Sequence, residues 1–573
     1  MSLSATANPS RSPLGRSRAR RVSSGGMGLA ILVLITAGVM SIPVLVVLGH
    51  VVAPTGEIWG HLASTVLPRY VRDTLLLMLG VGVGVSLIGV CSAWMVTMWR
   101  FPGVGAFEWL LLLPLSMPAY VIAYAYTGLL DYAGPVQTGL RAAFGWTTAR
   151  DYWFPEIRSL SGAVAMMSLV LYPYVYMLAR AAFLEQSVCA LEASRVLGCG
   201  PWRSFFKVAL PLARPAIVAG VSLALMESMN DIGTVQFFAV DTFTTGIYRT
   251  WMGLGEPVAA GQLGAVLLLV VFALMSLERF SRGKGGTQPA TARFRQLPRL
   301  TMKGWRAALA VVGCAIPVTF GFVLPAILLM SWGVRSGGAG IDAHFFTLAG
   351  NSFLLASCAA LMAVGVAVVL AYGRRLSPLP LVKAAVRVAS LGYATPGAVI
   401  AVGAMVPLTA LDHALNGWIE SATGVAPGLL LTGSVAGLLF VYLVRFLAVS
   451  LNSVEGSLAR ITSSLEGAAR TLGHGPWATL RRVHLPILRG SLLTAGLLVF
   501  VDVMKELPAT LIMRPFNFDT LAVRTFELAS DERLTEAAPA ALTIVAVGIL
   551  PVILLSRSIA RSRPGSTCEG GAA

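Results

Sequence analysis

The sequence has few charged residues for its length, and few cysteines and histidines. Only 12% of its 573 residues are Asp, Glu, Lys or Arg, about half of the share in soluble globular domains. Its six cysteines form no C-x-x-C pair, which argues against a disulfide framework and against a zinc or iron–sulfur site. Its six histidines form no cluster, so a metalloenzyme is not expected. We therefore expect neither a cofactor nor a tightly bound metal.

The sequence also lacks the motifs of nucleotide hydrolysis and of common hydrolases. No G-x-x-x-x-G-K-[ST], H-E-x-x-H or G-x-S-x-G segment occurs. The nearest fragment, GKGG at Gly283, has neither the spacing nor the hydroxyl of a phosphate-binding loop. We therefore predict that the chain is not an enzyme, and that any ATPase activity coupled to it belongs to a separate subunit.

The chain is nevertheless basic, with a formal net charge of +17. Its cations lie in short segments between apolar runs, and no basic face carries aromatic stacking residues. We therefore expect no nucleic-acid binding. This placement of charge instead favours contact with anionic membrane lipids.

Apolar residues are abundant, because 56% of the chain is hydrophobic. Twelve apolar runs are long enough to cross a bilayer, which takes about 20 residues. Since the lipid core offers no water to backbone groups, each run must be helical. The sequence thus predicts an all-α, polytopic membrane protein. The spans are expected near residues 27–48, 73–98, 106–130, 159–182, 212–232, 258–278, 307–331, 351–372, 384–410, 427–449, 488–507 and 537–556.

The N-terminal segment has the polarity of a signal peptide. Residues 1–26 contain five arginines and no acid, and an apolar run begins at Met27. This run is long enough to span a bilayer, and no A-x-A-like cleavage site closes it. We therefore expect a retained first membrane helix.

The polar segments alternate in charge along the chain. Those on the side of the N-terminus are rich in Lys and Arg, and those on the other side carry most of the acids. Under the positive-inside rule the basic side faces the cytoplasm. With twelve spans, both termini are expected on the cytoplasmic side of the inner membrane.

The chain contains an internal repeat. Residues 195–250 align without a gap to residues 470–525, and sixteen of the 56 positions are identical. An even number of spans separates the copies, so the repeat is parallel, with two six-helix halves. The predicted organisation is a basic cytoplasmic tail (1–26), a first module (27–280) with a polar loop (190–212), a basic cytoplasmic linker (281–306), a second module (307–556) with an equivalent loop (464–487), and a C-terminal cytoplasmic tail (557–573).

The first polar loop reads LEASRVLGCGPWRSFFKVALPLARP. Leu191–Leu197 can form a short helix, Gly198 can end it with a positive φ, and Pro201 can start a second helical segment. A helix–turn–helix on the cytoplasmic face is expected, with Trp202, Phe205 and Phe206 as apolar anchors for a partner. The second loop repeats the pattern with Glu466, Gly473, Gly475, Pro476, Trp477, Leu480 and Pro486.

The pattern E-A-A-x-x-x-G, followed some thirteen residues later by Pro, resembles the EAA loop of binding-protein-dependent ABC importer permeases. Ser194 replaces the second Ala in the first copy, and Gly467 occupies the usual Glu position in the second, with Glu466 one residue earlier. The resemblance implies two fused modules of the type I fold. It also implies that each loop couples to one of two ATPase copies, and that a periplasmic or lipid-anchored solute-binding protein delivers the solute. The coupling-loop positions are Glu192, Ala193, Gly198, Pro201, Trp202, Pro211, Glu466, Ala468, Gly473, Pro476, Trp477 and Pro486.

Two further segments look like the corresponding parts of ferric-iron importer permeases. They are MESMNDIGTVQFFAVDTFTTGIYRTW, from Met226, and DVMKELPATLIMRPFNFDTLAVRTFE, from Asp502. This resemblance implies ferric iron as the solute, moved by alternating access. Permeases for thiamine, an aminophosphonate or an inorganic anion remain open alternatives, as does an ion-coupled secondary transporter.

Four acids near the outer half of the membrane are candidates for the translocation pathway. Glu227 and Asp231 are four residues apart and share a helix face, and Asp502 and Glu506 occupy the equivalent positions. Ferric iron is a hard ion that prefers oxygen ligands, and acids at membrane depth favour a functional role. The alternative is inter-helix salt bridging, for example with Lys505, Arg249 or Arg524.

Overall fold

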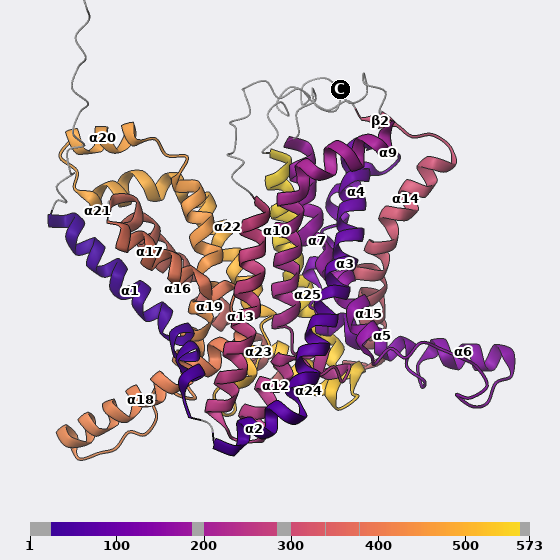
Figure 1. Ribbon diagram of the computed structural model, residues 1–573, viewed down its shortest axis with the longest axis horizontal. Helices are drawn as coiled ribbons and strands as arrows, with labels where there is room; N and C mark the ends of the chain where they lie inside the picture. The colour runs from indigo at the N-terminus through magenta and orange to yellow at the C-terminus, as the bar shows by residue number, and fades with distance from the viewer. Residues whose placement is uncertain are drawn as a thin grey trace, which may run out of the picture.

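The computed structural model describes residues 24–54, 56–185, 200–282, 299–338, 340–377 and 379–561. The predicted positions Glu192, Ala193 and Gly198 lie outside these ranges, as do most of both tails and of the linker. Within the described residues the protein is helical apart from one short strand pair (Figure 1), so the predicted all-α fold is confirmed.

The helices of the first half run from α1 to α13. They are α1 (Ser24–Gly49), α2 (Gly56–Thr65), α3 (Leu67–Met98), α4 (Val104–Leu110), α5 (Ala119–Leu130), α6 (Pro135–Phe144), α7 (Leu160–Glu185), α9 (Pro201–Ser204), α10 (Leu210–Asn230), α11 (Gly233–Phe237), α12 (Phe243–Tyr248) and α13 (Pro257–Arg282).

The helices of the second half run from α14 to α25. They are α14 (Trp305–Val318), α15 (Leu324–Arg335), α16 (Ala343–Leu376), α17 (Pro380–Ala389), α18 (Gly397–Thr423), α19 (Val435–Leu458), α20 (Ser463–Thr471), α21 (Pro476–Thr479), α22 (Leu485–Met504), α23 (Pro508–Met513), α24 (Leu521–Ser530) and α25 (Leu534–Arg561).

The number of membrane spans agrees with the prediction when one broken span is included. In the described part of the chain, eleven helices are long and apolar enough to cross a membrane. A twelfth span results if Val104–Ser116 and Ala119–Phe144, which meet at a bend of 89°, are counted together. The predicted continuous helix over 106–130 is therefore wrong. Pro114 and Pro118 lie at the break, where each removes a backbone donor.

A second boundary also differs from the prediction. The span expected over 384–410 is divided between α17, which ends at Ala389, and α18, which begins at Gly397. Pro396 directly precedes α18, with a φ of −56° and a ψ of 142°. Proline lacks a backbone N–H and disfavours helical geometry at the residue before it, here Thr395, so a helix cannot continue easily through this position. This break places the first turn of α18 inside the protein, beside the cavity described below.

The two halves repeat the same order of elements. Helices α7, α9 and α10 recur 275 residues later as α19, α21 and α22, each pair starting at equivalent positions. The offset of 275 residues between the sequence repeats therefore also relates the helices of the two halves, and the prediction of two parallel repeats is confirmed.

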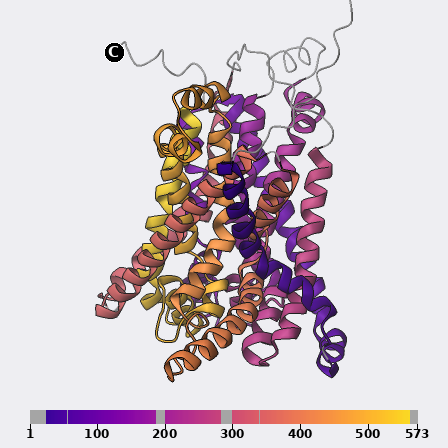
Figure 2. The same ribbon diagram turned by 90° about the vertical axis from the view of Figure 1, so that its left-hand side faces the viewer.

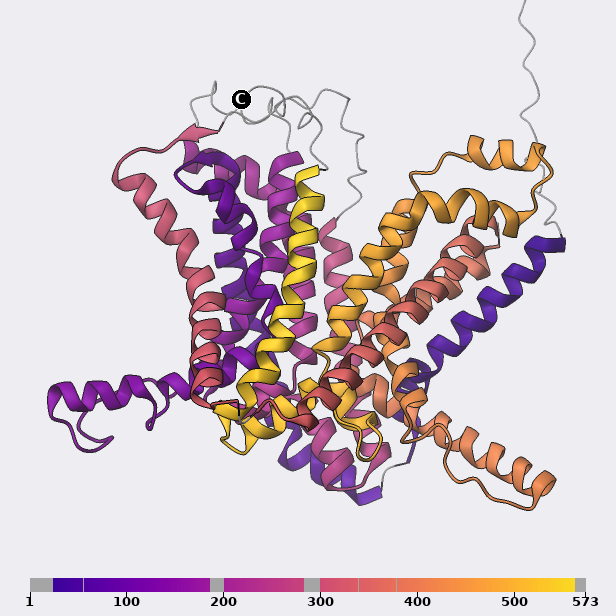
Figure 3. The ribbon, with the colours of Figure 1, turned by 180° about the vertical axis from the view of Figure 1, so that it is seen from behind.

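The halves exchange their first helices. Helix α1 packs against α16, α17 and α18 of the second half, whereas α14 packs against α3 and α4 of the first half and α15 packs against α5 (Figures 1 and 3). The two modules of the sequence are therefore not separate packing units, because each contributes a helix that packs against the other. One apolar core runs through both halves.

The two polar loops lie at the same end of the molecule. Helices α9, α20 and α21, strand β2 and the end of α25 gather there, whereas α2 and α12 lie at the opposite end (Figures 1 and 2). Toward the loop-bearing end the helices separate into two groups, one with α1, α16 and α22 and the other with α3, α7, α14 and α25.

The end of the linker is attached to the first half. Strand β2 (Leu300–Thr301) pairs in parallel with β1 (Trp99–Arg100). Beside it, the Glu108 carboxylate pairs with Arg180 at 2.5 Å and with Arg299 at 2.8 Å. These contacts fix where the chain re-enters the helical bundle as α14.

Candidate functional site

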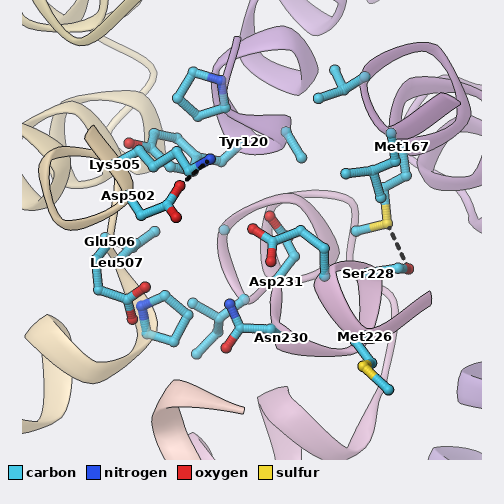
Figure 4. Close-up of a pocket in the computed structure, with 18 of the residues that line it drawn as sticks. Tyr120, Met167, Met226, Ser228, Asn230, Asp231, Asp502, Lys505, Glu506 and Leu507 are labelled. Carbon is cyan, nitrogen blue, oxygen red and sulfur yellow. Dashed lines mark hydrogen bonds and ion pairs between the residues drawn. The ribbon is translucent and has the colours of Figure 1, made fainter. Parts of the chain in front are cut away.

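A cavity of about 70 Å³ lies where α10 and α22 end (Figure 4). All four predicted pathway acids line it: Glu227 and Asp231 from the first half, and Asp502 and Glu506 from the second. The N-terminus of α5 and the middle of α7 complete its wall. The tertiary structure therefore brings together two pairs of acids that are 275 residues apart in the sequence.

The same local geometry positions one acid in each half. Helix α10 ends at Asn230, and Asp231 accepts a hydrogen bond from the Thr234 backbone N–H at 2.7 Å. In the second half Glu506 accepts one from the Ala509 backbone N–H at 3.0 Å. Each carboxylate thus caps the short helix that follows it, where negative charge is favoured.

In the second half both carboxylates are in ion pairs. Asp502 contacts the Lys505 ammonium at 3.0 Å, as the salt-bridge alternative predicted. Glu506 contacts the Arg445 guanidinium at 2.9 Å, and both of these side chains are almost fully buried. Arg249, another predicted partner, pairs instead with Asp241.

In the first half neither carboxylate makes an ion pair with a described residue, although Lys505 of the second half lies near enough to Glu227 to attract it. Asp231 makes no ion pair with any described residue, and it accepts its hydrogen bond from a backbone amide. Glu227 has neither a hydrogen bond nor an ion pair within the described ranges. The lining of the cavity holds four carboxylates and two cationic side chains, Lys505 and Arg445. With all six ionised, the cavity carries an excess of two negative charges.

Arg445 also joins the two halves. It donates to the Asn230 side-chain oxygen at 2.7 Å, and that oxygen accepts a second hydrogen bond, from the Gly397 backbone N–H, at 2.7 Å. A side chain at position 397 would clash with the guanidinium, so only glycine fits there. The sequence analysis missed this cluster. Its signal was a single arginine in the middle of the apolar run of α19.

The carboxylates do not form a closed metal site. Among the described residues, no group of three or more His, Cys, Asp or Glu side chains is arranged to hold a metal ion. The cavity offers dispersed oxygen atoms instead. A site of this kind can contact an ion without retaining it, as conduction requires.

The second polar loop folds as predicted. Helix α20 ends before Gly473, which has a φ of +80°, and α21 begins at Pro476. In the first loop, α9 likewise begins at Pro201. Pro211 and Pro486 are the second residues of α10 and α22, directly after a helical turn in each half. Ala468 is exposed on α20.

A π-helical turn follows each loop. The turns span Phe205–Ala209 and Leu480–His484, which are equivalent positions in the two halves. Such turns are rare and often occur at functional sites. Here they connect α9 and α21 to the long helices that end at the cavity.

The apolar surface of the loops differs in one respect from the prediction. Trp202 is 71% exposed and Trp477 is 55% exposed, as expected of partner anchors. Phe205, predicted to share that surface, is only 6% exposed, because its ring packs 4.8 Å from that of Trp94. Phe206 is exposed beside Trp202. The prediction for Phe205 is therefore wrong.

Glu466 points toward its own half. Its carboxylate lies 2.6 Å from Arg375 at the end of α16, and Arg375 also donates to the Ile461 carbonyl at 2.6 Å. The Glu466 side chain is mostly buried by this contact. It therefore holds α20 against the bundle.

Glu466→Gln should loosen the second loop. A hydrogen bond to a charged group contributes about 1.5–3 kcal/mol, so cleavage after the exposed Arg470 should become roughly tenfold faster or more. Limited trypsin digestion of the purified chain measures this rate. Glu420→Gln, at an exposed position on α18, is the matched control and should leave it unchanged. Equal rates for Glu466→Gln and wild type would contradict the assigned contact.

Comparison with known proteins shows a match to one family and similarity to several transport permeases. Residues 12–281 match the family described as "Binding-protein-dependent transport system inner membrane component". The chain is 26% identical to the Fe(3+)-transport system permease protein FbpB 2 of Haemophilus influenzae over 514 residues, 86% of this chain and 90% of that protein.

Shorter relatives align with about one half of the chain. The molybdenum transport system permease protein ModB of Escherichia coli K12 is 28% identical over 208 residues, 35% of this chain and 87% of its own length. The putative 2-aminoethylphosphonate transport system permease protein PhnV of Salmonella typhimurium is 29% identical over 267 residues, 44% of this chain and 94% of its own length.

Proposed function

This chain belongs to the family of binding-protein-dependent transport permeases of the inner membrane, and we propose that the solute it carries is ferric iron. The coarser function, a multi-pass permease of an ABC importer, follows from the family match and the membrane-spanning helices. The proposal adds the identity of the solute, the direction of the chain in the membrane and the arrangement of its partners.

The charge of the cavity is the observation that carries the proposal. Four carboxylates face two cationic side chains between the two halves. Opposite charges attract strongly in a poorly hydrated site, and like charges repel. A trivalent cation is therefore favoured there over molybdate or a phosphonate. The long alignment with an iron(III) permease supports the same solute.

The position of the two loops supports a model for energy coupling. In this model one ATPase subunit docks on α9 with the segment before it, and a second docks on α20 and α21. Both tryptophans are exposed at the same end of the molecule, where the helices separate into two groups. The loop-bearing end would face the cytoplasm with both termini, and a solute-binding protein would deliver iron at the opposite end.

Transport in a reconstituted system tests the proposed solute. The chain would be placed in proteoliposomes together with its ATPase, and the binding protein loaded with radiolabelled ferric iron would be added outside. We expect ATP-dependent accumulation of iron that excess molybdate does not inhibit. Accumulation of labelled molybdate, with no uptake of iron, would overturn the assignment.

A further inference from the structure

We propose that the residues of the two halves have different roles at the cavity. Glu227, Asp231 and Tyr120 of the first half form the wall that contacts the cation, whereas Asp502 and Glu506 of the second half serve in neutralised structural pairs. The inference rests on the proposed function in that the ligand is a hard cation. It goes beyond that function because it assigns different roles to residues that the repeat makes equivalent.

One difference between the repeats creates the asymmetry of the first pair of acids. Glu227 and Asp502 are equivalent, and the residue three positions later is Asn230 in the first half and Lys505 in the second. At that spacing Lys505 reaches Asp502 and neutralises it, at 3.0 Å. Asn230 carries no charge, and its side-chain oxygen is already occupied by Arg445 and Gly397. Glu227 therefore makes no ion pair with a described residue, and the cation that attracts it, Lys505, is in direct contact with Asp502 instead.

The second pair of equivalent acids shows the same asymmetry. Glu506 faces the buried Arg445 guanidinium, and its ion pair is sealed from solvent, with 3% of its side chain exposed. Asp231 is bound only by the amide end of α11, and no described cation contacts it. The negative excess of the cavity thus lies on the first-half wall, opposite the paired residues (Figure 4).

Tyr120 provides an independent sign of a ligand on the same wall. It lines the cavity, it is 3% exposed, and its hydroxyl has no hydrogen-bond partner among the described residues. Leaving a buried hydroxyl unpaired is unfavourable, and a bound cation would satisfy its oxygen. Its hydroxyl lies within electrostatic reach of Asp231 on this wall, and also of Glu506 and Lys505 of the second half. Oxygen donors of this kind are what a hard cation prefers.

The second-half pairs have a different consequence. The Arg445 contact with Asn230 crosses between the halves, and its contact with Glu506 joins α19 to the end of α22 within the second half. An ion that displaced Glu506 from Arg445 would leave a buried arginine unpaired, which is strongly unfavourable. The cation is therefore expected to pass along the first-half wall, with water completing its coordination.

Terbium(III) luminescence tests the division of roles. Tb³⁺ is a soluble, hard trivalent cation, and its emission is sensitised by a nearby excited tyrosine. The purified full chain in nanodiscs of neutral lipid would be titrated with Tb³⁺. Glu227→Gln and Asp231→Asn should each weaken binding roughly tenfold or more, and Tyr120→Phe, which keeps the ring, should reduce the sensitised emission. Glu420→Gln, on the exposed part of α18, should change neither.

The matched comparison is the double variant Asp502→Asn with Lys505→Gln. It removes a carboxylate and a cation together, so the net charge is kept, and affinity should stay within about twofold of wild type. Weakening as large as that of Glu227→Gln, or no effect of Glu227→Gln and Asp231→Asn, would overturn the inference. If the first-half variants lose Tb³⁺ but the wild-type complex imports no iron, the solute assignment fails and the site stands. If iron is imported but the double variant Asp502→Asn with Lys505→Gln weakens Tb³⁺ binding as much as Glu227→Gln does, the proposed function stands and the difference in roles fails.

Discussion

Replacing Trp202 and Trp477 together by alanine should abolish co-purification of the ATPase with this chain. Both indoles are exposed, on α9 and α21, at positions that the repeat makes equivalent. Tryptophans at the centre of an interface often contribute 2 kcal/mol or more each, so losing both should weaken binding by roughly a thousandfold. The measurement is the amount of ATPase retained on the tagged permease, alongside ATP-dependent uptake.

The matched control is Trp153→Ala. Trp153 is 86% exposed and lies in the segment that follows α6 rather than in either loop. It tests whether loss of any exposed tryptophan reduces ATPase binding. The single variants at Trp202 and Trp477 should each give a partial loss. Full retention of the ATPase by the double variant would refute the proposed docking surface, whatever the uptake result.

Arg445→Met should destabilise the protein more than removal of any exposed arginine. The guanidinium is the shared partner of Glu506 and Asn230, and the substitution would leave a buried carboxylate unpaired. Breaking a buried pair in this way costs about 3–5 kcal/mol. Unfolding of the purified chain, followed by the loss of helical circular dichroism with temperature or denaturant, measures the effect.

Two further variants make this experiment decisive. Adding Glu506→Gln to Arg445→Met removes the unpaired charge and should restore part of the lost stability. Arg533→Met breaks the exposed pair with Glu536, which should cost at most about 1 kcal/mol. If Arg445→Met is no less stable than Arg533→Met, the cluster does not hold the halves together as described.

Several features could be predicted from the sequence because they depend on hydrophobicity and on the backbone preferences of single residues. Long apolar runs must become helices in lipid, and the prediction of an all-α fold followed from that requirement. Gly473 and Pro476 ended and started helices where their backbone preferences required. The two breaks that were missed, at Pro114 and Pro396, lie inside apolar runs, where hydrophobicity outweighed the proline signal.

Only part of the candidate site could be predicted from the sequence. The repeat identified four acids, and the structure places all four at one cavity. Which of them is neutralised could not be read from the residues alone, because Arg445 reaches Glu506 across 61 residues and Asn230 across 215. The burial of Phe205 was missed for a similar reason, since its neighbour Trp94 belongs to α3.

The sequence by itself therefore determined the helical, membrane-spanning character, the twofold repeat and the residues of the two loops, because these follow from hydrophobicity, backbone preference and internal similarity. Only the tertiary structure decided how the first helices are exchanged, which face of each loop is exposed, and which acids form ion pairs. Those properties depend on contacts between residues far apart in the chain, and such contacts form only when the two halves pack together.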